Sequence, residues 1–426
     1  MEKRWNVFVL SRTIERRMHL CLFEDITAGN FQALTHFRPV YDLRCGILTL
    51  RERIQRMLAP SYVSLYCRRY LAPYLPEQNP ETEINTISSD SCVFVNGRCI
   101  MTPSLAKLIR KTKHDTLFMS GNEVVAARLS GANLAKSRSE EYTDALDLSA
   151  LVSIPIVEVN AKLVHYPWDL VSENGRQIEA DFSILKRKAA SRKQSIHRSA
   201  VLLGRKNIRI GKGTNIGPGV VLDATEGPIF IGDNVHVYPT AVIEGPCFIG
   251  DGSAIKIGAK IYGGTSIGPV CKVGGEVVES IFHSHVNKQH DGFVGHSYLG
   301  EWVNLGAGTT TSNLKNTYGT VKVHVGGELV DSGKMFVGLT AGDHVKTGIN
   351  STLDTGTVIG AGSNIFGTNI PPKHIPPFSW GTAGKLERYD VEKALAVAVK
   401  VMDRRNVSAS PAYQELFRSV YQMTKR

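Results

Sequence analysis

The feature that most constrains this chain is an aliphatic residue that recurs at every sixth position in its second half. The longest unbroken run has the members Ile231, Val237, Ile243, Ile249, Ile255, Ile261, Ile267 and Val273. Shorter runs with the same step are Ile210, Ile216 and Leu222, then Phe293, Leu299 and Leu305, then Leu353, Ile359 and Ile365. A step of six fits neither the period of an α-helix nor that of a simple exposed strand. It predicts a solenoid whose turns have three flat faces, with one aliphatic side chain per face pointing inward.

The glycines support this prediction. Only six of the 40 glycines lie in residues 1–200, and the other 34 lie between Gly204 and Gly384. Many directly follow the periodic aliphatic residue, as in Ile231–Gly232 and Ile249–Gly250. Small residues permit sharp corners, and the lack of a glycine at every third position excludes collagen. The pattern resembles the left-handed parallel β-helix of hexapeptide acyltransferases, and this resemblance implies a trimer with active sites between neighbouring prisms.

Charge and cysteine usage exclude several classes of protein. Residues 182–222 hold ten Lys and Arg and no Asp or Glu, which is nearly all of the net charge of +11. No nucleic-acid-binding motif accompanies this run, so we interpret it as a solvated linker or as a contact to nucleotide phosphates. The seven cysteines form no CxxC pair, and no apolar stretch approaches the ~20 residues of a membrane span. These features predict a cytoplasmic protein without a nucleic-acid or membrane partner.

The six-residue step is interrupted between Val273 and Phe293. The interruption predicts a loop extruded from the solenoid, and loops on rigid scaffolds often carry function. This segment contains His283, His285 and His290. We interpret His283 and His285 as loop polar residues, because no carboxylate or cysteine at ligand spacing supports a metal site.

His290 begins a pattern that resembles a known family. Asn304 follows it by 14 residues and opens the sequence NLGAGT, and Asn313 lies nine residues farther on. The pattern is similar to the acetyltransferase half of the bifunctional UDP-N-acetylglucosamine pyrophosphorylase/glucosamine-1-phosphate N-acetyltransferase family. The resemblance implies N-acetylation of an aminosugar phosphate by acetyl-CoA, with His290 as the general base. A neutral imidazole with a pKa near 6.5 suits that task at pH 7.

The same resemblance implies roles for further residues. Asn304 and Asn313 would bind the sugar, and Gly306 and Ala307 would lie along the acetyl-CoA site. Lys256 stands where the family has an arginine that binds the substrate phosphate. Phe293, also expected to contact the substrate, stands in place of a family tyrosine, and the chain reads GGEVVES where the family has a pair of lysines.

The first half of the chain predicts an α/β domain of another kind. The segment LTHFRPVYDLRCGILTLRERI resembles sugar nucleotidyltransferase-like proteins that precede the same β-helix. Such proteins have a glycine-rich phosphate loop after the first strand, whereas residues 24–30 here read EDITAGN. Arg38, Asp42 and Arg44 stand near the family's Pro-Lys signature and are candidate nucleotide-binding residues. Mg²⁺ is the metal that nucleotidyl transfer would use, but residues 96–98 read NGR and lack the family's metal-binding aspartate.

The sequence therefore predicts four parts. They are a nucleotidyltransferase-like α/β domain (1–182), a basic linker (183–200), a left-handed β-helix (201–375) and a C-terminal helical tail (376–426), with caps at Asp390 and at Ser410 before Pro411. We predict a homotrimeric sugar-nucleotide enzyme whose β-helix carries acyl transfer, with nucleotidyl transfer by the first domain left open. The alternatives are a single activity or a non-catalytic trimer that binds a sugar nucleotide.

Overall fold

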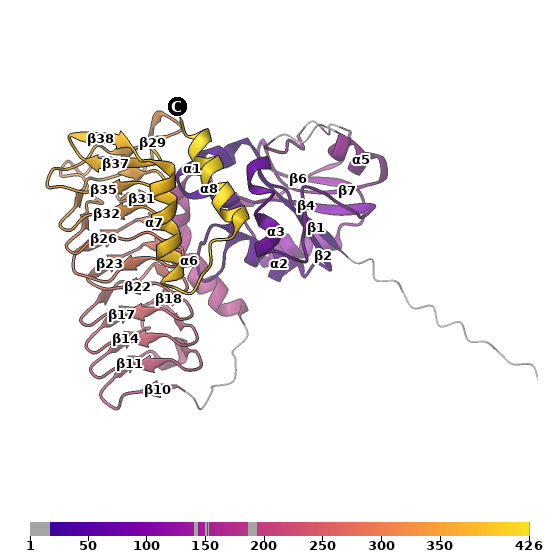
Figure 1. Ribbon diagram of the computed structural model, residues 1–426. Helices are drawn as coiled ribbons and strands as arrows, with labels where there is room; N and C mark the ends of the chain where they lie inside the picture. Colours follow the sequence, from indigo (N-terminus) through magenta and orange to yellow (C-terminus); the bar gives the residue numbers. More distant parts are fainter. Residues whose placement is uncertain (1–17, 140–143, 150, 152, 186–193, 426) are drawn as a thin grey trace, which may run out of the picture.

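The computed structural model describes residues 18–139, 144–149, 151, 153–185 and 194–425. An α/β domain lies against the side of a long β-helix, and two C-terminal helices contact both (Figure 1). Residues 1–17, and residues 186–193 of the predicted linker, lie outside the described residues.

The α/β domain is built on one mixed sheet. Its strands, in spatial order, are β3 (Glu83–Ile84), β2 (Tyr62–Leu65), β1 (His19–Phe23), β4 (Ser91–Asn96), β7 (Glu123–Ser130), β6 (Thr116–Ser120) and β8 (Ile156–Glu158). A short pair, β5 (Cys99–Ile100) and β9 (Lys162–Leu163), lies beside it. The helices are α1 (Gln32–Thr35), α2 (Leu50–Leu58), α3 (Leu75–Gln78), α4 (Pro103–Lys111), α5 (Gly131–Ser139) and α6 (Pro167–Ile184). Since the parallel strands β1 and β4 are adjacent and the strand order reverses between them, their carboxyl ends meet at the point where such sheets usually bind ligands.

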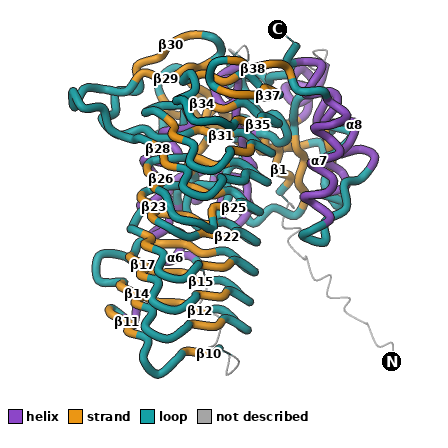
Figure 2. Tube along the Cα trace, turned by 60° about the vertical axis from the view of Figure 1, so that its left-hand side comes forward, coloured by secondary structure: helices purple, strands orange, loops and turns teal. Residues whose placement is uncertain are grey.

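The second half is a left-handed parallel β-helix with three faces, as predicted. The first face contains β10 (Ser195–Ile196), β13 (Asn215–Ile216), β16 (His236–Val237), β19 (Ala254–Ile255), β22 (Lys272–Val273), β25 (Asn287–Lys288), β32 (Lys346–Thr347), β35 (Asn364–Ile365), β37 (Ser379–Thr382) and β38 (Lys385–Arg388). The second contains β11 (Val201–Leu203), β14 (Val221–Asp223), β17 (Val242–Glu244), β20 (Lys260–Ile261), β23 (Glu276–Val278), β26 (Phe293–Gly295), β28 (Thr310–Thr311) and β33 (Thr352–Leu353). The third contains β12 (Ile208–Ile210), β15 (Ile229–Ile231), β18 (Cys247–Ile249), β21 (Thr265–Ile267), β24 (Ile281–Phe282), β27 (Tyr298–Leu299), β31 (Thr340–Ala341), β34 (Val358–Ile359) and β36 (His374–Ile375). The periodic aliphatic side chains from Ile231 to Val273 are buried in the common core, and the stacked coils are visible in Figure 2.

The interruption of the repeat is not an extruded loop, which corrects the sequence prediction. Ile255 pairs with Val273, 18 positions on, but Val273 pairs with Lys288, only 15 positions on. The coil therefore continues with shorter corners, and Val294 points inward in place of Phe293. The real excursion follows β28 and contains the antiparallel hairpin β29 (Lys322–Val325) and β30 (Glu328–Asp331). The six-residue step could not locate it, because a shortened coil and an inserted loop break the period in the same way.

The ends of the β-helix extend beyond the ranges expected for it. Strand β10 lies within residues 183–200, and β37 and β38 form a hairpin after residue 375. Helices α7 (Val391–Asp403) and α8 (Pro411–Met423) follow, capped by Asp390 and Ser410 as predicted. They pack on Trp302 and Phe378 of the β-helix and on Phe37 of the α/β domain. In the described part of the chain, no helix is long and apolar enough to span a membrane.

Candidate functional site

His290 lies at the edge where the first face of the β-helix turns into the second. Its imidazole is exposed and forms no hydrogen bond with any described residue. The corner is held by Lys288, whose amino group donates to the carbonyl oxygen of His290 at 2.5 Å. Lys288 points into the prism opposite Val273, and burial lowers its pKa to about 8. The backbone of the corner is thus fixed from inside, while the imidazole is free to contact a ligand.

Asn304, Gly306 and Ala307 share this edge with His290. The side-chain amide of Asn287 donates to the side-chain oxygen of Asn304 at 2.6 Å, and Gly308 N donates to Asp291 O at 3.1 Å. These contacts stack the corner of Gly306 and Ala307 on the corner of His290. A Cβ on Gly306 would lie 2.3 Å from a carbonyl oxygen of the next coil, so this corner needs glycine. The structure therefore brings the predicted base, one predicted sugar ligand and the predicted acetyl-CoA corner together.

Asn313 lies at another edge of the prism. It follows β28 of the second face, and its side-chain amide lies 2.9 Å from Nδ1 of His296. Phe293 begins the strand between the two edges and is half-buried. The three extended residues of β26, Phe293–Gly295, alone span about 10 Å between these two edges. Within one chain, Asn313 is therefore too far from His290 to act on the same atom.

His296 is a further residue of this edge that was not predicted from the sequence. One ring nitrogen contacts Asn313, and the other lies 3.5 Å from a carboxylate oxygen of Glu279. The ring also stacks on Phe336, and burial lowers its pKa despite the nearby Glu279 charge. Because both nitrogens have protein partners, His296 orients Asn313 and is less available than His290 for proton transfer. No motif or spacing distinguishes this histidine in the sequence.

His283 and His285 contact protein groups. Nδ1 of the buried His283 lies 3.3 Å from the Tyr298 hydroxyl, and His285 stacks on Trp302 at 4.0 Å between ring centroids. Both histidines therefore pack against protein side chains, and neither belongs to a metal site among the described residues.

Lys256 belongs to a group of four cations that we call the basic cluster: Lys256, Lys272, Arg404 and Arg405. Lys272 points outward from the first face, and Arg405 donates to Val270 O at 3.0 Å, which brings the end of α7 onto this face. The positive charge of Arg405, followed by burial and the charges of Lys256 and Arg404, lowers the pKa of Lys272. Among the described residues, no carboxylate forms an ion pair with any of the four. Lys272, Arg404 and Arg405 were missed because two arginines at the end of a helix are common for electrostatic reasons alone.

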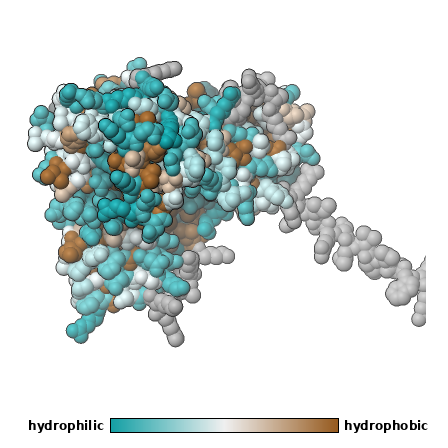
Figure 3. Space-filling model, in the orientation of Figure 1, coloured by the Kyte–Doolittle hydropathy of each residue, from teal (hydrophilic) through white to brown (hydrophobic). Residues whose placement is uncertain are grey.

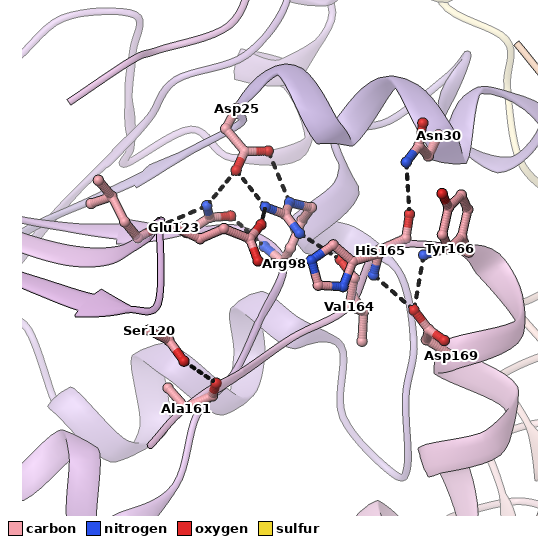
Figure 4. A network of polar contacts seen from close by, with 12 residues as sticks. Asp25, Asn30, Arg98, Ser120, Glu123, Ala161, Val164, His165, Tyr166 and Asp169 are labelled. Atoms are coloured by element: carbon pink, nitrogen blue, oxygen red, sulfur yellow. Dashed lines mark hydrogen bonds and ion pairs between the residues drawn. The ribbon is translucent and has the colours of Figure 1, made fainter. Parts of the chain in front are cut away.

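At the carboxyl ends of β1 and β4, an arginine occupies the centre of the ligand site expected for this kind of sheet. Figure 4 shows the side chain of Arg98 between Asp25 and Glu123. Its Nε and Nη2 donate to Asp25 at 2.8 and 2.5 Å, and Nη2 donates to Glu123 at 2.7 Å. The second carboxylate oxygen of Glu123 lies 2.8 Å from Nε2 of His165. Burial favours a higher pKa for Asp25, but the hydrogen bonds and charge of Arg98 outweigh it and lower the pKa.

These residues do not fit Mg²⁺. The carboxylates that could bind a cation are already paired with the fully buried Arg98. Asn96, two residues before Arg98, donates from its side-chain amide to Asp25 at 2.7 Å. No group of three or more His, Cys, Asp or Glu within the described residues could hold a metal ion. The guanidinium supplies the positive charge between the carboxylates, and it leaves them no free coordination for a metal.

Arg38, Asp42 and Arg44 do not line a nucleotide site, which corrects the sequence prediction. Arg38 donates to Asp343 and Glu301 of the β-helix at 2.8 Å each. Arg44 N donates to the Tyr298 hydroxyl at 2.8 Å, and its guanidinium donates to Ile47 O. Asp42 pairs with Arg51 at 2.6 Å. All three stabilise the α/β domain or its contact with the β-helix, and sequence proximity to a family signature could not reveal these partners.

Comparisons with known proteins agree with this architecture. Residues 20–190 match a family model described as sugar nucleotidyl transferase. The chain is 42% identical over 91 residues to a bifunctional sugar-1-phosphate nucleotidylyltransferase/acetyltransferase of Sulfurisphaera tokodaii, covering 21% of this chain and 23% of the relative. It is 30% identical over 176 residues to the bifunctional protein GlmU of Synechococcus elongatus, covering 40% of this chain and 33% of the relative. The chain thus spans about a quarter to a third of the length of these relatives.

Solved structures of UDP-N-acetylglucosamine acyltransferases also match. The Francisella novicida protein aligns with a TM-score of 0.28 and 17% identity, covering 55% of this chain and 79% of that chain. The Arabidopsis protein aligns with a TM-score of 0.22 and 14% identity, covering 54% and 97%. The family model and the curated relatives together confirm the resemblance to sugar nucleotidyltransferases and to bifunctional nucleotidylyltransferase/acetyltransferases that the motifs indicated.

Proposed function

We propose that the β-helix transfers an acetyl group from acetyl-CoA to the amine of an aminosugar phosphate, with His290 as the general base. The observation that carries this proposal is the edge shared by His290, Asn304 and Ala307, where the imidazole is exposed and has no partner within the described chain. The likeness to bifunctional nucleotidylyltransferase/acetyltransferases supports the same reaction class.

The chemistry follows from these groups. Acetyl-CoA supplies a thioester carbonyl, which the amine of the acceptor attacks. His290 takes the proton that the nitrogen loses as the C–N bond forms, and can return it to the departing thiolate. Asn304 orients the sugar, and the tight corner at Gly306 and Ala307 lets the thioester approach the backbone closely. A neutral imidazole is a suitable general base for this step near pH 7.

The basic cluster supplies a contact for the acceptor's phosphate. The family's lysine pair is missing from GGEVVES, and Lys272, Arg404 and Arg405 provide positive charge beside Lys256 instead. Successive coils are about 4.8 Å apart, so Lys272 lies two coils from Asn304 on the same face. That separation suits a sugar ring whose amine faces Asn304 while its phosphate contacts the cluster.

A homotrimer completes the site in this proposal. Asn313 and His290 lie at different edges of one prism, so a neighbouring prism must supply the second edge if both act on one acceptor. Apolar side chains exposed at the corners of the β-helix, such as Ile257 and Ile349 at 69 and 70% exposure, favour such packing. In the view of Figure 3, apolar side chains form separate patches among hydrophilic ones on the surface of the β-helix.

The test is release of free CoA thiol from acetyl-CoA in the presence of glucosamine 1-phosphate and a panel of other aminosugars. We expect His290→Ala to lower the rate by at least about 100-fold, the usual scale of a general base. The matched control is His114→Ala, because His114 is exposed on the α/β domain. Thiol release that is absent with every aminosugar, or that is equal in both variants, would refute the proposal.

Nucleotidyl transfer by the first domain is a second candidate, supported by the family match over residues 20–190. The pairing of Arg98 with Asp25 and Glu123 argues against the metal-dependent form of this reaction. Pyrophosphate release from UTP or dTTP with a sugar 1-phosphate and Mg²⁺ tests it directly. Pyrophosphate release above the background without the protein would show that the chain has both activities. Its absence would leave acyl transfer as the single activity.

A further inference from the structure

A large cavity lies where the α/β domain, the β-helix and the last helix meet. Its volume is about 730 Å³, within the range of small-molecule sites. Its walls come from the segment after β1 (24–30), the start of α6, the β29–β30 hairpin, the corner at residues 374–377 and the end of α8. These elements come from distant parts of the sequence, the first just after β1 and the last at the end of α8. The cavity therefore depends on how the two halves of the molecule pack together.

Glu24, Asp25 and Arg68, three of its charged side chains, are already paired with protein groups. Glu24 accepts from Arg68 at 3.0 Å, and Asp25 accepts from Arg98. The remaining donors of Arg68 are used by the Tyr70 hydroxyl and by carbonyl oxygens of Thr35 and Arg38. Among the described lining residues, this leaves no unpaired arginine or lysine to bind a phosphate, and exposed Asp144 adds negative charge. The cavity does not suit a nucleoside triphosphate.

Three histidines, His36, His324 and His374, line the same space. His36 is 8% exposed, and neither ring nitrogen forms a hydrogen bond with a described residue. Burial, followed by the charge of Arg68, lowers its pKa to about 4, so it is uncharged at pH 7. His324 and His374 stack with 5.2 Å between centroids, and burial lowers the pKa of His374 as well. A neutral imidazole offers one donor and one acceptor, which matches a hydroxyl group, and an unpartnered buried imidazole is costly unless a ligand or water satisfies it.

The cavity also offers apolar surface for a ring. Trp168 lines it and stacks on Tyr166 at 4.4 Å between centroids, which fixes its orientation. Ile26, in the segment after β1, also lines the cavity and is 85% exposed. Small-molecule sites combine such apolar surface with a few placed polar groups. We propose that this cavity is a second ligand site that binds an uncharged sugar through its hydroxyl groups, separately from the acyl-transfer site and without a metal.

A glycine in the wall allows a clean test. A Cβ on Gly29 would meet nothing within 4 Å, and its backbone is not in the left-handed region, so Gly29→Leu adds a bulky side chain to the cavity wall without strain. Gly384→Leu is the matched control, because Gly384 has the same open surroundings in the β37–β38 hairpin, outside the cavity. Isothermal titration of the full chain with N-acetylglucosamine measures the effect. We expect Gly29→Leu to weaken binding at least about tenfold, a change of about 1.4 kcal/mol, and Gly384→Leu to leave it unchanged.

Two further measurements test the role of the imidazole and the independence of the two sites. His36→Phe replaces the imidazole with an apolar aromatic ring that has no nitrogens, and we expect it to weaken binding about tenfold without lowering the thermal midpoint of unfolding. CoA thiol release should stay at the wild-type rate in Gly29→Leu, which separates this site from the acyl-transfer edge. The proposal is overturned if the wild type does not bind N-acetylglucosamine, if Gly29→Leu binds it as well as Gly384→Leu does, or if uridine or Mg²⁺–UTP is the ligand that Gly29→Leu displaces.

Discussion

Polar side chains gather in two regions of this molecule. In one region they have hydrogen-bond and ion-pair partners within the protein, and in the other they have none among the described residues. At the carboxyl ends of β1 and β4, Arg98 is bonded to Asp25, Glu123 and a backbone carbonyl. On the first face of the β-helix, the imidazole of His290 has no hydrogen-bond partner and the basic cluster has no ion-pair partner among the described residues. A buried network that is fully satisfied stabilises one structure. Groups left without such partners are available to a ligand, so the two regions predict opposite responses to substitution.

The largest effect on the free energy of unfolding is expected at Arg98, in the region where the polar groups have partners. Arg98→Met removes the cation between two carboxylates and leaves them facing each other. We expect a loss of about 2–3 kcal/mol in the free energy of unfolding, somewhat less than for a fully buried pair because Asp25 and Glu123 reach solvent. Urea denaturation measures it, and Arg110→Met, at an exposed position of α4, is the control. A loss below about 0.5 kcal/mol, the scale of a surface substitution, would mean that Arg98 is not a structural residue.

The difference between the regions also bears on what the sequence could predict. The β-helix was predictable because each coil repeats the same requirement for an inward aliphatic residue and a small corner residue. Arg38 was misassigned because its partners Glu301 and Asp343 lie 263 and 305 positions away, and no local pattern indicates them. The edge of His290 was predictable because its residues lie in neighbouring coils and so in one short segment.

For other residues, the sequence shows the residue type but not its contacts in the fold. Lys288 stands at an inward position where the repeat requires an aliphatic side chain, and only the fold shows that its amino group reaches a corner carbonyl. Arg404 and Arg405 follow an ordinary helix, and only tertiary packing places them beside Lys272. Cavities between domains, such as the one lined by His36, depend on tertiary packing in the same way.

An intermediate effect is expected at Lys288, the buried lysine beneath His290. Burial lowers its pKa in the folded protein to about 8, whereas the unfolded chain has an ordinary lysine pKa near 10.4. Between these values the unfolded state binds more protons, so the stability of the folded protein rises with pH. Relative to Lys288→Met, the wild type should gain about 1–3 kcal/mol between pH 7.5 and pH 10. Urea denaturation of both proteins across this range measures it, and parallel pH profiles would show that the amino group is not buried in solution.

The smallest change in stability is expected at the basic cluster, where the change in binding should be large. Lys272→Met removes one of several like charges, so the free energy of unfolding should stay the same or rise by up to about 0.5 kcal/mol. If the cluster holds the phosphate of the acceptor, the same substitution should raise the KM for glucosamine 1-phosphate several-fold and leave kcat nearly unchanged, because the phosphate lies away from the reacting amine. Lys260→Met is the control, since Lys260 is exposed and has Glu276 as a partner at 3.7 Å. A marked loss of stability in Lys272→Met would mean that Lys272 has a stabilising partner in the protein. The two regions would then not differ in the way described above. An unchanged KM would show that the cluster does not hold the phosphate of the acceptor.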